Sequence, residues 1–185
     1  MTISRTEAED ALSEIERTAG RTQVLRGYQV GGPILMLWGA IWVVGYVAMG
    51  LLPGRQWGLV WLPLDVIGIV GSIAMSAKAR GGAKGAGRWR TLAGIVTIAA
   101  FCGAVLAIFQ PTTPQPYLAF PGLLVGVIYS LVGVGRMMTR YLWIGGAVFV
   151  ATLVGFFWFP MWLAYWMAAA GGGGLILGGL WMRGA

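Results

Sequence analysis

The chain alternates between long apolar runs and short polar or basic segments. A helix needs about 20 residues to cross a hydrocarbon core, and six apolar runs approach or exceed this length. They cover residues 28–52, 57–79, 89–109, 117–135, 141–158 and 160–181. The pattern therefore predicts an all-α fold, a polytopic membrane bundle of six transmembrane helices within residues 28–183. The helices are expected to form three hairpins, over residues 28–79, 89–135 and 141–182.

Residues 1–27 are the only stretch with the composition of a soluble segment. Apolar residues recur there at spacings of four, three and four, which is typical of an amphipathic helix: Ala8, Leu12, Ile15 and Ala19. Thr6 and Glu9 fit a capping box at its start, and the acidic residues argue against a cleaved signal peptide. We expect a cytosolic amphipathic arm. It either docks a partner or neighbouring subunit, or lies on lipid headgroups or on its own membrane domain.

The basic residues predict how the bundle is oriented. Twelve of the 13 Lys and Arg lie in the arm, the linker Lys78–Arg90, the link Arg136–Arg140 and the C-terminal tail, whereas the opposite face has only Arg55. Basic loops stay on the cytoplasmic side, so both termini are expected in the cytoplasm. The membrane is expected to be the inner membrane of the cell. This distribution explains the net charge of +7 without a nucleic-acid partner.

The linker between the second and third runs is rich in glycine as well as basic. A phosphate-binding loop is one interpretation of such a composition, but the Gly-Lys-Ser or Gly-Lys-Thr ending and the preceding strand are both missing. A flexible segment against anionic lipid fits the sequence better.

Composition supports a membrane protein and excludes several chemistries. Charged residues make up 10% of the chain, against roughly 25% in soluble domains. The chain has no histidine, which excludes histidine-ligated haem, histidine metal sites and Ser-His or Cys-His catalysis. Its single cysteine, Cys102, excludes an intrachain disulfide. We therefore expect no enzyme, no metal centre and no cofactor, although a carotenoid or quinone among tryptophans stays open.

Asp65 is the only acidic residue after position 16. If its helix begins near Trp57, the carboxylate lies about 12 Å below the outer boundary. There it must be protonated, paired or facing water, as a proton-coupling or cation-binding group would be. If the helix begins at Pro63 instead, Asp65 falls in the first turn, where the helix dipole stabilises an acid. Both interpretations are open at this stage.

Five of the ten tryptophans gather near the outer ends of the helices, with spacings of four that align on a helix face: Trp57, Trp61, Trp158, Trp162 and Trp166. They either line a vestibule for an apolar or cationic ligand or form the aromatic belt at the membrane interface. Trp38 and Trp42 lie deeper in the first run and are expected to fill the bundle core.

Glycine and serine are concentrated in the second helix of each expected hairpin. Small residues allow close helix packing in lipid. We therefore expect these helices at the centre of the bundle, or at the interface of a homo-oligomer or with a membrane protein partner.

The first span, Leu37-Trp38-Gly39-Ala40-Ile41-Trp42-Val43-Val44-Gly45, follows a short acidic arm. In this layout the chain resembles a group of uncharacterised small bacterial multi-span membrane proteins. The resemblance implies a bacterial cell membrane and brings no activity or site residues. Two hypotheses follow: a transporter or channel-like binder of a small solute that uses Asp65, or a non-transporting accessory or structural subunit.

Overall fold

The computed structural model describes residues 5–79 and 87–184, without the side chains of residues 5–13, 16, 17, 87, 88, 90 and 91. The capping-box side chains of Thr6 and Glu9 and the centre of the basic linker lie outside the described residues. Every regular element in the described part is helical, which confirms the all-α prediction. The long helices are α1 (Arg5–Leu51), α2 (Trp57–Ala79), α3 (Gly87–Phe109), α4 (Pro114–Gly135) and α5 (Thr139–Trp158). The last helical stretch comprises η2 (Pro160–Trp162), α6 (Leu163–Trp166), the π-helical η3 (Met167–Gly172) and α7 (Gly173–Arg183), and the short η1 (Gly54–Gln56) precedes α2.

In the described part of the chain, six helical segments are long and apolar enough to cross a membrane, as the hydropathy pattern predicts. They are Thr18–Leu51, Gly54–Ala79, Leu92–Phe109, Pro114–Gly135, Thr139–Trp158 and Pro160–Arg183. Such lengths match the hydrocarbon core of a bilayer. The chain therefore has the composition and architecture of a multi-pass membrane protein.

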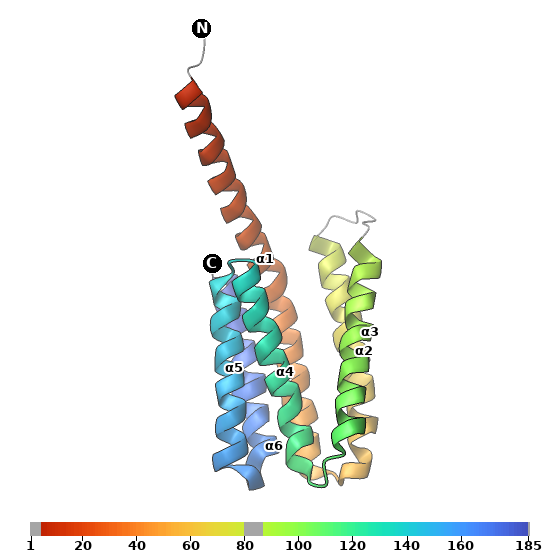
Figure 1. Cartoon of the computed structure of the whole chain (residues 1–185). Helices are drawn as coiled ribbons and strands as arrows, with labels where there is room; N and C mark the ends of the chain where they lie inside the picture. Colours follow the sequence, from red (N-terminus) through yellow and green to blue (C-terminus); the bar gives the residue numbers. More distant parts are fainter. Residues whose placement is uncertain (1–4, 80–86, 185) are drawn as a thin grey trace.

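The N-terminal arm and the first span are a single helix. α1 runs without a break for 47 residues, or about 70 Å at 1.5 Å per residue, and its first part extends beyond the bundle (Figure 1). Pro33 is the only proline inside it, so a single backbone donor is missing and the helix continues past it. On the arm, the described side chain of Ile15 is 65% exposed, so this part of the helix does not pack on the bundle.

α1, α4, α5 and the last span form the closely packed part of the molecule. The closest pairs are α4 with α5 and α1 with α7. Glycines bring α1 close to η3 and α7: a methyl group added to Gly39 would lie 2.7 Å from the carbonyl oxygen of Gly172 on η3, and one added to Gly179 on α7 would lie 2.5 Å from that of Gly32. The glycines of the last span thus pack against α1 of the same chain, and only such small residues permit this approach.

Arg140, at the start of α5, connects α5 to α1 and α7 at one end of the packed helices. Its guanidinium lies 5.3 Å from the ring centroid of Tyr28 on α1 and 5.1 Å from that of Trp181 on α7. It also donates a hydrogen bond to the carbonyl of Trp181. The start of α5 is thereby tied to two other helices through cation–π contacts.

α2 and α3 stand to one side of the packed helices (Figure 1). α2 packs mainly on α1, and α3 makes few close backbone contacts with any described helix. α2 is therefore at the periphery and not at the centre of the bundle. Large apolar side chains on the pair are exposed, among them Leu59, Val96 and Phe109, as expected of helices surrounded by lipid.

Candidate ligand-binding site

The helix that carries Asp65 begins at Trp57, with Pro63 inside it. Asp65 is therefore eight residues into α2, about 12 Å from its start, and the first turn of α2 contains no acidic residue. The interpretation of Asp65 as a first-turn, dipole-stabilised acid is wrong. Pro63 removes only one backbone donor, a loss that membrane helices tolerate, so the helix does not have to start there.

α1 and α2 pack through a reciprocal pair of tryptophans and glycines. A methyl group on Gly68 would lie 2.8 Å from the ring of Trp38, and one on Gly45 would lie 2.8 Å from the ring of Trp61. On each helix the tryptophan and glycine are seven residues apart, which places them on one face. Asp65 lies between Trp61 and Gly68 at helical spacings of four and three, so it belongs to the same face, toward α1.

An edge-to-face aromatic cluster lies next to Asp65. The centroid of the Tyr46 ring lies 5.5 Å from that of Trp42, with an angle of 78° between the ring planes. It also lies 5.5 Å from the centroid of Trp61, with an interplanar angle of 81°. Tyr46 is fully buried, and its hydroxyl donates a 2.9 Å hydrogen bond to the carbonyl of Leu118 on α4. Such geometry is the favoured one for aromatic pairs, and the cross-helix hydrogen bond fixes the central ring.

Three indole N–H groups in and around this cluster have partners within the protein. Trp61 Nε1 lies 2.9 Å from Met49 Sδ, and Trp38 Nε1 donates a 3.0 Å hydrogen bond to Ser72 Oγ. Trp57 Nε1 donates to the carbonyl of Leu52 at 3.1 Å. The polar edges of these rings are therefore engaged, which leaves their apolar bodies and faces for contact with a ligand.

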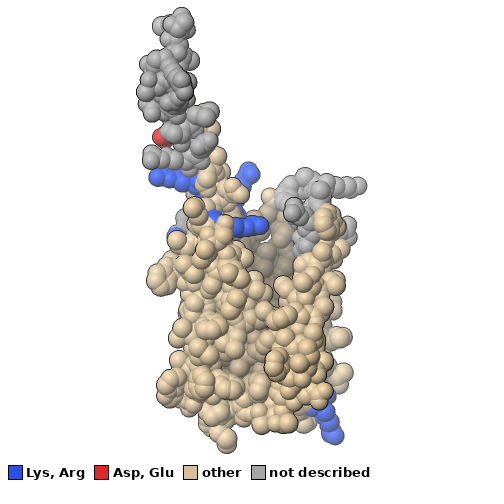
Figure 2. Space-filling view, in the orientation of Figure 1, with Lys and Arg blue, Asp and Glu red and all other residues tan. Residues whose placement is uncertain are grey.

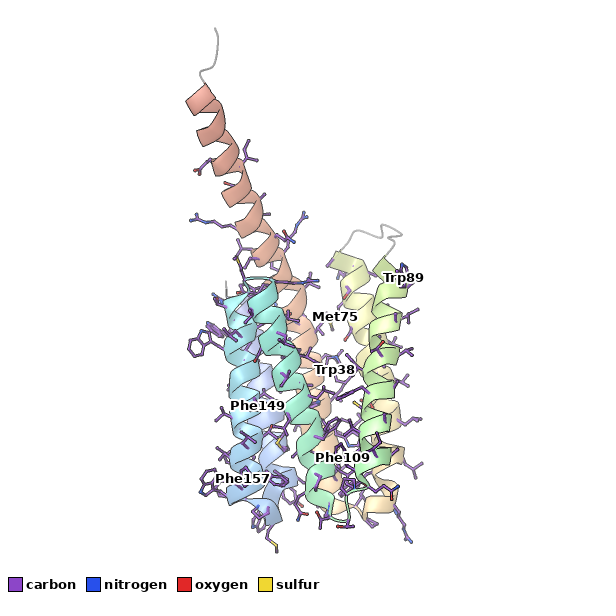
Figure 3. All side chains as sticks on the ribbon, in the orientation of Figure 1. Trp38, Met75, Trp89, Phe109, Phe149 and Phe157 are labelled. Atoms are coloured by element: carbon purple, nitrogen blue, oxygen red, sulfur yellow. The ribbon has the colours of Figure 1, made fainter. Side chains whose placement is uncertain are left out.

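Asp65 and these aromatic residues line a cavity of about 550 Å³ between α1, α2, α3 and α4. This volume lies within the range of small-molecule sites, roughly 300–1,000 Å³. α4 contributes Tyr117, Phe120 and Tyr129, and α3 contributes Cys102 and Leu106. Trp38 points into the space between the packed helices and the α2–α3 pair (Figure 3). The wall is almost entirely aromatic and aliphatic, with Asp65 as its acid.

The Asp65 carboxylate opens into this cavity. The residue is half-buried, no hydrogen bond or ion pair to it occurs among the described side chains, and neither of its oxygens is a buried atom lacking a partner. The described basic side chains lie on the arm or near the two ends of the bundle (Figure 2): Arg21, Arg26, Arg55, Lys78, Arg136, Arg140 and Arg183. The carboxylate is therefore free to take a proton, water or a cation from outside the described part of the protein.

The structure separates the five tryptophans that the sequence grouped together. Trp57 and Trp61 line the cavity. Trp158 and Trp162 lie at the α5–η2 corner and are 71% and 66% exposed. Trp166 packs inside, where its Nε1 donates a 2.7 Å hydrogen bond to the carbonyl of Ala151. The exposed pair has the position of an aromatic belt, away from Asp65.

Several cavity residues were not proposed from the sequence. Trp42 belongs to the buried core and Trp38 packs against it, as expected, but both also line the cavity, together with Tyr46. These three residues are spaced by four along α1, and that spacing is the signal that could have grouped them. No such spacing identifies the cavity residues of α3 and α4, because nothing in the sequence shows that these two helices and α2 enclose the same cavity. Among the described residues there is no group of three or more His, Cys, Asp or Glu side chains suited to a metal.

No protein-family model, curated protein or solved structure matches this chain. The function is therefore inferred from the residues of the cavity.

Proposed function

We propose that this protein binds a small solute in the α1–α4 cavity and carries it across the membrane, with Asp65 as the coupling group. One observation supports this function above all others. The only acidic residue after position 16 opens into an aromatic cavity of about 550 Å³ within the apolar helices. A carboxylate at such a depth is costly, roughly 2.5–3.5 kcal/mol on insertion scales. The presence of this carboxylate is best explained by a function that requires a negative charge or an exchangeable proton.

The proposed orientation places both termini in the cytoplasm of a bacterial cell, with the six spans in three hairpins in the inner membrane. It is supported by the distribution of charge. The α4–α5 link and the C-terminus lie at the end of the bundle from which the arm extends (Figure 1). That end has Arg136, Arg140 and Arg183, whereas Arg55 lies in the turn between α1 and α2. The positive-inside rule then assigns the arm to the cytoplasm.

Coupling follows from the single carboxylate. Asp65 can hold a proton or stabilise a bound solute, and the two states differ by one charge. Exchange of one state for the other on opposite sides of the membrane would link solute movement to the proton gradient. Loosely packed α3 is the wall of the cavity that can move at least cost, because it gives up few contacts with the other helices.

Proteoliposomes under an imposed pH gradient test this proposal. Three small aromatic solutes of different charge serve as probes: ethidium, indole and benzoate. We expect gradient-driven accumulation of at least one probe with the native protein and its loss in Asp65→Asn. Glu14→Gln is the matched control, because it removes an exposed acid on the arm and should leave uptake unchanged. Uptake that is equal in the native protein and Asp65→Asn, or absent from both, contradicts a coupled carrier.

The loose attachment of α3 and the exposed outer face of α2 favour a second candidate function, that of an accessory subunit. Their exposed apolar side chains would then be covered by another copy or by a larger membrane protein. Native mass spectrometry of protein extracted gently from its own membrane separates the candidates. A copy bound to a larger assembly without any small molecule supports the accessory function, whereas a retained small molecule supports the carrier.

A further inference from the structure

We propose that the solute is a lipophilic organic monocation, such as a quaternary ammonium or phosphonium, which exchanges for one proton at Asp65. This inference rests on the proposed solute site and specifies its ligand. Three properties of the cavity lead to it: its charge, its aromatic faces and the low polarity of its wall.

The charge of the cavity selects a cation. Asp65 is the only acid that lines it, and its described lining contains no Lys or Arg. An anion would meet a carboxylate with no described cation nearby to offset the repulsion. A neutral solute would leave an ionised carboxylate without a counter-charge in a medium of low polarity. One negative charge is matched by one positive charge.

The aromatic walls suit an organic cation. Trp61 precedes Asp65 by one helical turn, and its ring stands edge-on to Tyr46, which is edge-on in turn to Trp42. Ring faces attract cations that have shed their water, tryptophan most strongly. A cation beside the carboxylate is thus within reach of several rings, while its apolar arms can lie against the aliphatic and aromatic surface of α3 and α4.

The low polarity of the wall favours an organic cation over a metal ion. The Tyr46 hydroxyl is bonded to Leu118, the Trp61 N–H faces Met49, and the Trp38 N–H is bonded to Ser72. Besides Asp65, the hydroxyls of Tyr117 and Tyr129 line the cavity. A metal ion would need a shell of about six or more oxygen ligands, whereas a quaternary centre requires no hydrogen bonds.

The exchange of one proton for one monovalent cation at Asp65 conserves charge. The neutral acid of Asp65 and a free cation give an ion pair of carboxylate and cation plus one released proton. The other titratable groups that line the cavity are Tyr46, Cys102, Tyr117 and Tyr129. Asp65 is the one carboxyl group in the lining, so we assign the exchanged proton to it.

Cys102 provides a native reporter for the test, because it is the only cysteine of the chain and lines the cavity. The full-length protein in mild detergent is alkylated with N-ethylmaleimide in the presence of one of three probes. The probes are tetraphenylphosphonium, the anion tetraphenylborate of the same shape, and neutral triphenylmethanol. We expect tetraphenylphosphonium to protect the thiol at a concentration at least tenfold lower than either other probe. Asp65→Asn should abolish this difference, and Glu14→Gln should retain it.

The pattern of protection separates failure of this inference from failure of the site itself. If the neutral or anionic probe protects as well as the cation, the ligand class is wrong and the solute site stands. If no probe slows alkylation, both are overturned. Equilibrium dialysis with radiolabelled tetraphenylphosphonium is run in parallel. No more cation bound to the native protein than to Asp65→Asn, each eluting as the same folded species, overturns the ligand class whatever the reactivity of Cys102.

Discussion

Substitution of Gly45 by alanine tests whether the α1–α2 contact sets the shape of the cavity. The added methyl group would lie 2.8 Å from Cζ2 and 2.9 Å from Cη2 of Trp61, whereas ordinary contacts of this kind begin at 3.4 Å. The indole must therefore move by about half an ångström. It is confined by Tyr46 on one side and by the contact of its N–H with Met49.

The expected loss of stability is estimated by comparison with a glycine whose added methyl group would contact nothing. A methyl group on Gly146 in α5 meets nothing within 4 Å. Both substitutions gain the same helix propensity, about 1 kcal/mol, so this gain cancels when the two variants are compared. What remains is the overpacking at Gly45, typically about 1–3 kcal/mol. For a chain of this size each kcal/mol corresponds to roughly 2–4 °C in Tm.

Two assays check the prediction. Thermal unfolding in detergent should give Gly45→Ala a Tm at least about 2 °C below that of Gly146→Ala. Displacement of Trp61 should also raise the concentration of tetraphenylphosphonium that protects Cys102, while Gly146→Ala should leave it unchanged. Equal Tm values and equal protection in the two variants would refute the view that the Gly45–Trp61 contact positions this wall.

Three further predictions concern the packed helices and the charge of the site. Gly172→Ala should lower Tm relative to Gly173→Ala in thermal unfolding, because a methyl at Gly172 would lie 2.9 Å from a carbonyl oxygen of α1 while one at Gly173 meets nothing within 4 Å. Equal values would contradict the close α1–η3 approach. Arg140→Gln should cost about 0.5–2 kcal/mol through loss of cation–π contacts, seen as a lower Tm that Arg140→Lys partly restores; no change would mean that the contacts contribute nothing. Tetraphenylphosphonium binding should weaken as pH falls, by up to about tenfold per unit where the proton competes for Asp65, and equilibrium dialysis should find Asp65→Asn insensitive to pH.

Hydropathy was enough to locate the spans but not the junctions between elements. The second run, 57–79, coincides with α2, because a membrane helix satisfies all its backbone groups internally and so extends over the whole apolar run. No break in the helix marks the boundary expected between the arm and the first span before Tyr28. Composition changes there from polar to apolar, but the backbone of α1 has no reason to stop, since helix continuity depends on donors and acceptors and not on polarity.

The α1–α2 half of the site could have been predicted from residue spacing. Trp38 and Gly45 on one helix and Trp61 and Gly68 on the other repeat at seven, so two antiparallel neighbours can pair them, with Asp65 on the same face. The α3–α4 half could not. Cys102 on α3 and Phe120 on α4 line the same cavity because α3 stands away from the packed helices. The distance between two apolar helices cannot be predicted from their hydropathy.

The position of the cavity explains how a ligand site and a stable bundle can coexist in a short chain. Glycines let α7 and η3 approach α1 to backbone contact, and α4 packs closely on α5, so these helices supply the rigid part. The site lies at its edge, where Tyr46 is anchored to Leu118 while α3 completes the opposite wall with few contacts of its own. Binding elements that must move are drawn from the least stable parts of a fold. A ligand beside Asp65 would therefore touch fixed aromatic rings on one side and a weakly held helix on the other, so displacement of α3 could admit or release it without disturbing the core.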